Sequence, residues 1–499
     1  MNQSFLGDSD LFTALKDGKV KNIANVLPDF PMGGIHPPER KELTEHLPIE
    51  VMPDPPQLTL FLKQHVGYPS EVMFNLISEL HSPEYYLEDN ICKDGACRLD
   101  TSEKKQVKAA ELIGTTKNKI GASLHSGIDG IVDGVYDTIH PVLGKAPAII
   151  VSKKGQQSSP SFTPKDWAKY SKEALLSKIK AAGIVGLGGA GFPADIKLNV
   201  KPNIFLDTLI LNGSECEPYL TCDHRVMAEY PEDIIEGAKI ILKILGITRC
   251  VIGIENNKPD AIKALEDAVA NDPNKMGYDI FIQPLTVKYP HGSADQIMQS
   301  ITDRIRPSGK RSSSIGIIVQ NVYTTKTIYD AVALDKPFYE RVVTISGRGI
   351  ARQANLMVKI GTRLSDIVDY LGGTTSDLAK IVIGGPMMGV AVSSLNVPIT
   401  KTTSGVLFLT REEIGDDQKY GPCIRCGFCL DACPMGLEPN NIGIYVEAGR
   451  GAECEQFGFS DDCFQCGSCA YVCPANRPLV QFIGLARIKV EEAKKKEEN

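Results

Sequence analysis

The chain has 499 residues, of which 42% are hydrophobic and 23% charged, and its formal net charge is −7. This length exceeds what one hydrophobic core organises, so we expect a globular protein of several domains. The acidic balance, without a basic block, argues against nucleic acid as a partner. No stretch approaches the roughly 20 apolar residues of a membrane span. Residues 1–20 are polar and acidic, without the apolar core of a signal peptide, so we expect a protein in the cytosol or on the cytosolic face of a membrane.

An extended segment and a small β-rich module are expected in the first part of the chain. Residues 1–60 are rich in proline, with the run PMGGIHPP, and we expect them to wrap a neighbouring domain. Residues 71–105, which include Cys92 and Cys97, match no regular element. From 112 to 151, short β-favouring runs alternate with glycine turns, which predicts a small all-β sandwich.

Strands and helices alternate along the middle of the chain, after a helical pattern at 171–182. Strands are predicted at 208–211, 250–254, 279–282 and 315–320. Helices are predicted at 231–245, 259–270, 294–302 and 325–333. This alternation predicts a mostly parallel, doubly wound sheet. Another β-rich unit opens at 341 and contains the glycine loop GGPMMG.

Eight cysteines near the C-terminus form two copies of C-x2-C-x2-C-x3-C-P. In a cytosolic chain such crowding indicates metal ligation rather than disulfides. A [4Fe–4S] cubane needs four thiolates, and in two-cluster ferredoxins the fourth cysteine of each run ligates the other cluster. We therefore assign one cluster to Cys423, Cys426, Cys429 and Cys473 and the second to Cys463, Cys466, Cys469 and Cys433. Zinc also uses C-x2-C pairs, but two complete four-cysteine runs favour iron.

A glycine-rich loop, GIVGLGGAGFP at 183–193, follows the first predicted helix. Gly186, Gly188 and Gly191 satisfy G-x-G-x-x-G, with Gly189 between them. The context differs from a dinucleotide fingerprint, because a helix precedes the loop and no helix-forming run directly follows it. The loop is either a plain tight turn or a place where the backbone approaches a phosphate or a flat ring, and we favour the second interpretation. Lys197 is then placed to meet a phosphate, unless it is a solvated lysine.

The sequence LNGSECEP at 211–218 ends an apolar predicted strand. Ligands of open α/β sheets bind at the carboxyl ends of strands, so Asn212, Glu215 and Glu217 are placed to hydrogen-bond a ring or a ribose. The alternative is an acidic surface loop. The nearby Cys216 is expected to be a small buried residue rather than a ligand. The histidines stand in loop contexts without a second histidine at metal spacing, and we assign no catalytic residue.

Five motifs occur together in one order: FPMGGIHPPERKELT, GIVGLGGAGFPADIKL, LNGSECEPYLTCDHR, IVIGGPMMG and the two cysteine runs. With them the chain resembles the RnfC subunit of the Rnf complex, the ion-translocating ferredoxin:NAD+ oxidoreductase. Its glycine loop also resembles the FMN loop of the NADH-binding subunit of respiratory complex I. The resemblance implies a multidomain α/β protein with this order: an extended segment and barrel-sandwich hybrid module (1–160), a Rossmann-like FMN/NADH-binding α/β domain (161–338), a β-grasp module of the SLBB type (339–412) and a ferredoxin-like α domain with two [4Fe–4S] clusters (413–499).

The resemblance also implies a function. FMN would lie noncovalently near Gly186, Gly188, Gly189, Gly191, Lys197, Asn212 and Glu215, and nicotinamide would stack on it near Glu217. Electrons would pass between NAD(H), FMN and the two clusters in a peripheral subunit on the cytoplasmic face of the plasma membrane. Its partners would be NADH and the other Rnf subunits, both the iron–sulfur one and those in the membrane, with ferredoxin reached indirectly.

The chain departs from the family where Ala294 and Asp295 replace the usual Glu and Lys after Tyr-Pro, and the segment 71–105 resembles an insertion. Two alternatives stay open. One is a soluble flavo-iron–sulfur reductase of another pathway, similar to cobalamin reductases or to the electron donors of amino-acid reductases. The other is a non-catalytic electron-wiring subunit.

Overall fold

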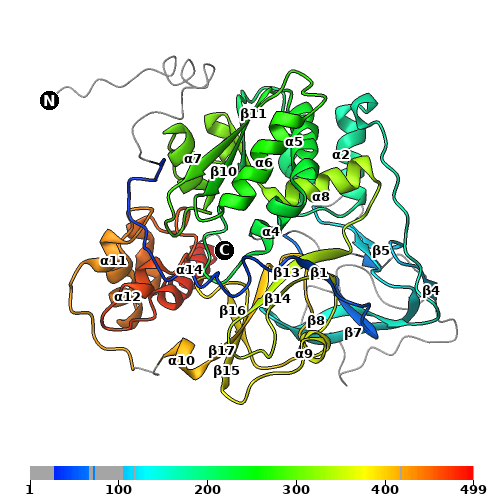
Figure 1. Ribbon diagram of the computed structural model, residues 1–499. Helices are drawn as coiled ribbons and strands as arrows, with labels where there is room; N and C mark the ends of the chain where they lie inside the picture. The colour runs from blue at the N-terminus through cyan, green and yellow to red at the C-terminus, as the bar shows by residue number, and fades with distance from the viewer. Residues whose placement is uncertain are drawn as a thin grey trace.

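The computed structural model describes residues 27–66, 71–72, 105–116, 120–189, 191–415 and 419–497. Cys92, Cys97 and most of the predicted insertion lie outside the described residues. Four modules follow one another along the chain, and the α/β domain lies above the two β modules in the view of Figure 1. No helix in the described part of the chain combines the length and the apolar character needed to cross a bilayer.

The N-terminal β module confirms the predicted all-β unit. Its larger sheet has the order β2-β8-β7-β4, formed by Gln57–Phe61, Gly144–Lys153, Gly130–His140 and Gln106–Val107. Its smaller sheet has the order β3-β5-β6, formed by Glu71–Val72, Leu112–Thr115 and Leu124–His125. β7 and β8 make a long antiparallel hairpin, and alternate residues such as Ile149 and Val151 are fully buried on one side of β8.

The α/β domain contains the predicted parallel sheet, in the order β11-β10-β9-β12. The strands are β9 (Thr208–Asn212), β10 (Arg249–Glu255), β11 (Asp279–Leu285) and β12 (Ile317–Asn321). The helices are α2 (Lys172–Ala181), α3 (Ala194–Leu198), α4 (Cys222–Glu229), α5 (Pro231–Leu245), α6 (Pro259–Asn271), α7 (Ala294–Thr302) and α8 (Val322–Ala333).

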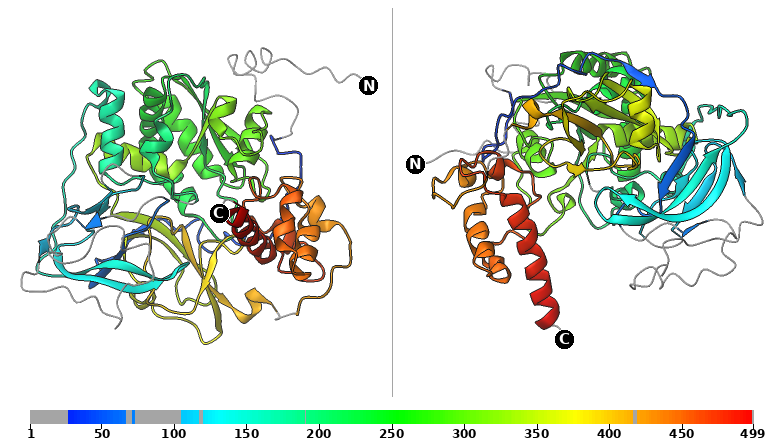
Figure 2. Two further views of the ribbon diagram at one scale, coloured as in Figure 1. Left: turned by 180° about the vertical axis from the view of Figure 1, so that it is seen from behind. Right: turned by 90° about the horizontal axis from the view of Figure 1, so that it is seen from below.

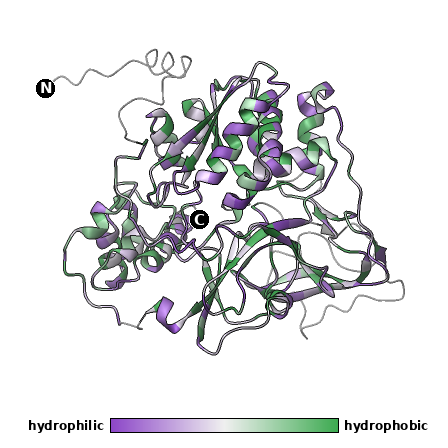
Figure 3. Ribbon diagram, viewed as in Figure 1, coloured by the Kyte–Doolittle hydropathy of each residue, from purple (hydrophilic) through white to green (hydrophobic). Residues whose placement is uncertain are grey.

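Alternating side chains of the central strand β9 explain why helices cover both faces of this sheet. Leu209 and Leu211 belong to one buried cluster, which includes the apolar residues of α5, whereas Ile210 packs with Ile297 of α7 on the other side. Figure 3 shows that the helices over the sheet carry hydrophobic and hydrophilic stripes, as such packing requires. The helix α8 begins three residues before its predicted start, because the Asn321 side chain accepts the amide hydrogen of Thr324 and caps it.

The second β module contains β13 (Glu340–Ser346), β14 (Ala354–Lys359), α9 (Leu364–Tyr370), β15 (Leu378–Ile383), β16 (Val390–Val392), β17 (Gly405–Thr410) and α10 (Arg411–Ile414). Its sheet has the order β1-β14-β13-β17-β15-β16. The edge strand β1 (Ile49–Val51) comes from the N-terminal segment and pairs in parallel with β14. That segment therefore completes a sheet far from it in sequence, which agrees with the expectation that it wraps a neighbouring domain.

The cysteine-rich domain consists of short helices around its two cysteine runs. Its elements are α11 (Phe428–Asp431), α12 (Pro439–Glu447), η6 (Gly451–Phe457), α13 (Ser468–Tyr471) and α14 (Leu479–Glu497). Ile442, Phe459, Leu479 and Ile483 belong to its small core. This domain lies beside the α/β domain, and the last helix extends away from the other modules (Figure 2).

Candidate functional site

A cavity of about 1070 Å³ lies where all four modules meet. Its lining includes Gln64, His65 and His140 of the N-terminal module, Gly188, Gly189, Asn212, Glu215, Cys216, Glu217, Asp223, Tyr289, Asp295, Arg306 and Asn321 of the α/β domain, Gly385, Met388 and Thr402 of the second β module, and Asp462, Cys463 and Phe464 of the cysteine-rich domain. The carboxyl ends of the parallel strands β9 and β12 open into this cavity, which is where ligands of open α/β sheets bind.

The glycine loop is closed at its base and reaches the cavity with its tip. Val185 pairs with Pro193, and the Gly186 amide donates to the Phe192 carbonyl at 2.9 Å. At the tip, a Cβ added to Gly189 meets nothing within 4 Å, so the backbone faces open space there. Such a loop leaves room for a flat ring directly against the main chain.

Other residues predicted around the loop lie further from the cavity. Gly186 and Gly191 form the base; Gly191 has a φ of +70°, and a Cβ added there would lie 2.9 Å from the Thr402 side chain. Lys197 is on the short helix α3 and is not one of the residues that line the cavity in the described chain, and burial lowers its pKa to about 8. The expectation that no helix follows the loop is wrong, because α3 begins directly after Pro193; five residues are too few to give a helical pattern in sequence.

Asn212 and Glu215 line the cavity, but their side chains form hydrogen bonds with backbone groups of the protein. The Asn212 Nδ2 group donates to the Gly292 carbonyl at 2.7 Å. The Glu215 carboxylate accepts the amide hydrogens of Asp223 and His224 at 2.7 and 3.1 Å, which satisfies the N-terminus of α4. Both residues therefore shape the wall of the site.

Glu217 joins the acidic loop to the second β module. Its carboxylate accepts the amide hydrogens of Met387 and Met388 at 3.0 and 2.9 Å. Burial raises its pKa to about 7, against the hydrogen bonds and the nearby Lys41 charge that favour the ionised form. A Cβ on Gly385 would lie 2.2 Å from this carboxylate, so the GGPMMG loop needs glycine at that position.

Sequence reasoning missed several residues of the site, among them Asn321, Asp223 and Tyr289. Asn321 ends strand β12, and its Nδ2 group donates to Asp223 at 2.7 Å. Burial and the neighbouring Glu215 raise the pKa of Asp223 to about 7. The Tyr289 hydroxyl donates to the Cys466 carbonyl at 2.6 Å and so links the α/β domain to a cysteine loop. The strand-end rule that selected Asn212 applies equally to Asn321, whereas nothing in the sequence indicated the partner of Tyr289.

Asp295, which stands where the family usually has lysine, is paired with an arginine of the same domain. Arg306 donates to both carboxylate oxygens of Asp295, at 2.7 and 2.9 Å, and reaches Asp462 at 3.4 Å. Such a two-pronged pair is strong and directional. The acid that replaces the usual lysine is therefore neutralised, and the pair also ties the start of α7 to the residue before Cys463.

The eight predicted cluster cysteines gather into two groups of four. One small cavity is lined by Cys423, Cys426, Cys429 and Cys473, and the other by Cys433, Cys463, Cys466 and Cys469. Each group takes its fourth cysteine from the other run, which is the arrangement that crossed ligation requires. Four thiols around one space fit a cubane cluster, and ligation by these particular residues stays a prediction. Cys463 lines the large cavity as well.

Comparison with known proteins agrees with this organisation. Family profiles match at residues 29–78 (RnfC barrel sandwich hybrid domain), 179–330 (Nuo51 FMN-binding domain), 342–391 (SLBB domain) and 420–493 (4Fe-4S dicluster domain). The profiles confirm the predicted domain types, and they identify FMN and two [4Fe–4S] clusters as the cofactors. Among solved structures, an NAD+-reducing [NiFe]-hydrogenase is 18% identical with a TM-score of 0.45, covering 65% of this chain and 62% of that chain.

Curated relatives cover most of the chain. The chain is 38% identical to the C subunit of the proton-translocating ferredoxin:NAD(+) oxidoreductase complex of Clostridium ljungdahlii, over 83% of each protein. It is 36% identical to the C subunit of the ion-translocating oxidoreductase complex of Rhodobacter capsulatus, over 92% of this chain and 83% of that protein. It is 33% identical to the C subunit of the Na(+)-translocating ferredoxin:NAD(+) oxidoreductase complex of Acetobacterium woodii, over 85% of this chain and 88% of that protein. The chain therefore belongs to the RnfC family of ion-translocating oxidoreductase subunits.

Proposed function

We propose that this chain is the NAD(H)-handling subunit of a membrane-bound ferredoxin:NAD+ oxidoreductase and passes electrons between NAD(H), FMN and two [4Fe–4S] clusters. Bound FMN supplies the conversion between two-electron and one-electron transfer. The observation that carries the proposal is the shared wall of the cavity, which is lined both by Gly188 and Gly189 of the glycine loop and by Cys463. A ring against the glycine loop thus shares its cavity with a cluster cysteine.

The size and the charges of the cavity support a nucleotide site. Its volume of about 1070 Å³ is just above the range of roughly 300–1,000 Å³ for small-molecule pockets, which suits a flavin together with a nicotinamide. Asp295 stands where the family usually has lysine. Because Arg306 pairs with Asp295, this acid leaves no uncompensated negative charge against a dinucleotide phosphate. This pairing favours a working site over the wiring-only alternative.

The place of the chain in a complex is also proposed. The relatives are named as subunits of ion-translocating complexes, which supports a peripheral position on the cytoplasmic face, with the iron–sulfur subunit and the membrane subunits of an Rnf complex as partners. Co-purification with hydrophobic subunits is the expected result. A fully soluble homo-oligomer that reduces its own acceptor would support the soluble-reductase alternative instead.

Anaerobic titration of the purified protein with NADH tests the electron relay. We expect flavin bleaching in the ultraviolet–visible spectrum, followed by paramagnetic resonance signals of reduced clusters. Intact clusters without any flavin absorbance would contradict the proposal.

A substitution at Gly189 makes this test specific to the cavity. An added side chain meets no protein atom there, so Gly189→Val should fold normally yet occupy the space of the ring. We expect it to lose FMN while keeping its iron, with Gly189→Ala losing less FMN as the smaller control. Full FMN content in Gly189→Val would place the flavin elsewhere.

A further inference from the structure

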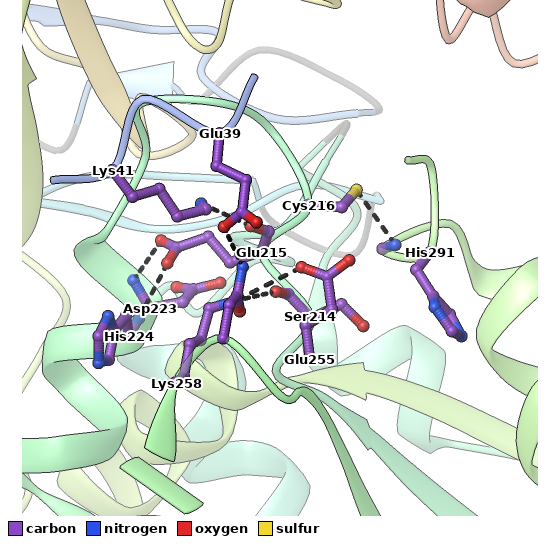
Figure 4. Close-up of polar contacts among 12 residues, drawn as sticks. Glu39, Lys41, Ser214, Glu215, Cys216, Asp223, His224, Glu255, Lys258 and His291 are labelled. Carbon is purple, nitrogen blue, oxygen red and sulfur yellow. Dashed lines mark hydrogen bonds and ion pairs between the residues drawn. The ribbon is translucent and has the colours of Figure 1, made fainter. Parts of the chain in front are cut away.

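A buried lysine from the N-terminal segment is bonded to the backbone of the acidic loop. Lys41 is 3% exposed, and its ammonium group donates to the carbonyl oxygens of Glu215 at 2.8 Å, Glu217 at 3.0 Å and Leu220. Figure 4 shows the side chain reaching the loop from a separate segment. All three N–H donors of the Lys41 ammonium group thus bond to one loop of the cavity wall.

A second buried lysine acts on the same loop. Lys258 donates to the Ser214 carbonyl at 2.6 Å and to the Asn257 side chain at 2.7 Å, with Glu255 at 3.4 Å (Figure 4). Two ammonium groups therefore take up the carbonyl oxygens along this loop. The negative ends of these peptide dipoles point toward the lysines.

The backbone of this loop is strained at two residues. Glu215 has a φ of 49° and Tyr219 a φ of 67°, the left-handed region that side-chain-bearing residues avoid. In this region the Cβ atom comes too close to the following carbonyl oxygen, so surrounding contacts have to hold each residue there. The Tyr219 amide also donates to the Glu39 carbonyl at 2.8 Å, so the N-terminal segment holds the loop at both strained positions.

The direction of the carbonyls determines where the amide hydrogens point. In a trans peptide the C=O and N–H bonds point in opposite directions, so the amide hydrogens of Glu215 and Cys216 point away from the lysines. Both residues line the cavity. Within the described chain neither of these two amides donates a hydrogen bond to another residue. Consecutive free amides form a cradle for an electron-rich group.

We propose that Lys41 is a positioning residue for the flavin, turning the loop so that the amides of Glu215 and Cys216 donate to the electron-rich edge of the flavin ring. This inference rests on the proposed FMN site and adds the residue that prepares it. Reduction increases the negative charge of the ring, and fixed donors with a buried cation behind them stabilise that charge. Lys41 therefore makes the flavin easier to reduce.

Two variants of the same segment test this role. Lys41→Met should weaken FMN binding by about tenfold, the effect of losing one to two good hydrogen bonds, and should make the flavin midpoint potential more negative. Thr44→Val is the matched control, because it removes the 2.8 Å contact between Thr44 and Thr221 from the same segment without touching the loop carbonyls. We expect Thr44→Val to keep the affinity and the potential of the wild type. Equal potentials in Lys41→Met and the wild type overturn the proposal.

Hydrogen exchange of the wild-type protein provides a test that does not depend on the folding of a variant. Adding FMN to flavin-stripped protein should slow amide exchange in the peptide that contains Glu215 and Cys216. Unchanged exchange in that peptide on FMN binding overturns the role of the loop. A wild-type protein that binds no FMN would instead refute the proposed function, so the two failures are distinguishable.

Discussion

Glu217 shows how one side chain in this site couples burial to proton binding. Its pKa is raised from 4.5 to about 7 by burial. Between these pH values the folded chain keeps the proton that the unfolded chain has released. Raising the pH therefore favours the unfolded state, and the stability due to this group falls by up to about 3 kcal/mol across the window.

The substitution Glu217→Gln should remove this pH dependence, because glutamine does not titrate; its single amide oxygen keeps one of the two amide hydrogens of Met387 and Met388. We expect the unfolding temperature of the variant to decline less than that of the wild type between pH 5 and 7. Asp223, whose pKa is also about 7, stays in both proteins and cancels in the comparison. The control is Glu266→Gln, on the exposed face of α6. If Glu217→Gln follows the wild-type pH profile, Glu217 does not titrate in this range.

Single residues were the part of the site that sequence reasoning described least completely. The loops that carry Gly188, Gly189 and Glu217 were identified, because glycine runs and strand ends are local features of sequence. The bonding of Lys41 and Tyr289 was not, because their partners lie more than 170 residues away. A hydrogen bond to a backbone carbonyl also leaves no trace in the residue type of its acceptor.

At the scale of elements, substitutions in the two cysteine loops can distinguish crossed ligation from an arrangement in which each run of four cysteines holds its own cluster. Cys473→Ser should lose the cluster of Cys423, Cys426 and Cys429, with about half of the iron. The other cluster, whose Cys463 lines the large cavity, should still be reduced by NADH.

The companion substitution Cys433→Ser should have the opposite effect. It should lose the cluster next to the cavity, so NADH reduces the flavin but the remaining cluster only slowly. Iron analysis and paramagnetic resonance after rapid freezing distinguish the two variants. If each run holds its own cluster, the two outcomes exchange places.

Elements with strong periodicity were predictable from sequence. The helices α5 and α7 have their predicted bounds, since the proline and acidic residues at the start of α5 and Gly246 after its end are local signals. The strand β1 was not predictable, because three residues between prolines have no pattern of their own. Its existence depends on β14, which follows it in sequence by about 300 residues.

At the scale of the whole molecule, Lys401 joins three modules. Its buried ammonium group donates to the carbonyls of Ser123 in the N-terminal module and Gly183 at the start of the glycine loop. Its own amide donates to Gln64 at 2.9 Å. One residue of the second β module therefore fixes the base of the glycine loop against its neighbours.

Replacing Lys401 by methionine should weaken this junction. Two buried carbonyls lose their donor, at about 1–3 kcal/mol each, so the unfolding temperature should fall clearly. Differential scanning calorimetry measures the effect, and Lys380→Met, on an exposed position of the same module, is the control. An unfolding temperature equal to that of the control would mean that the modules are held together elsewhere.

The N-terminal segment has a consequence for how the protein is assembled during translation. It leaves the ribosome before its partners: the Gly34 amide bonds to the Ala432 carbonyl, and the Thr44 carbonyl accepts from Asn355, 311 residues later. The partners of Lys41 and of β1 are synthesised before the cysteine-rich domain, so these contacts can form first, whereas the Gly34 contact has to wait for Ala432. A nascent chain can therefore complete the Lys41 side of the cavity wall as soon as the second β module has been synthesised, and the cysteine-rich domain then fixes the start of the segment at Gly34.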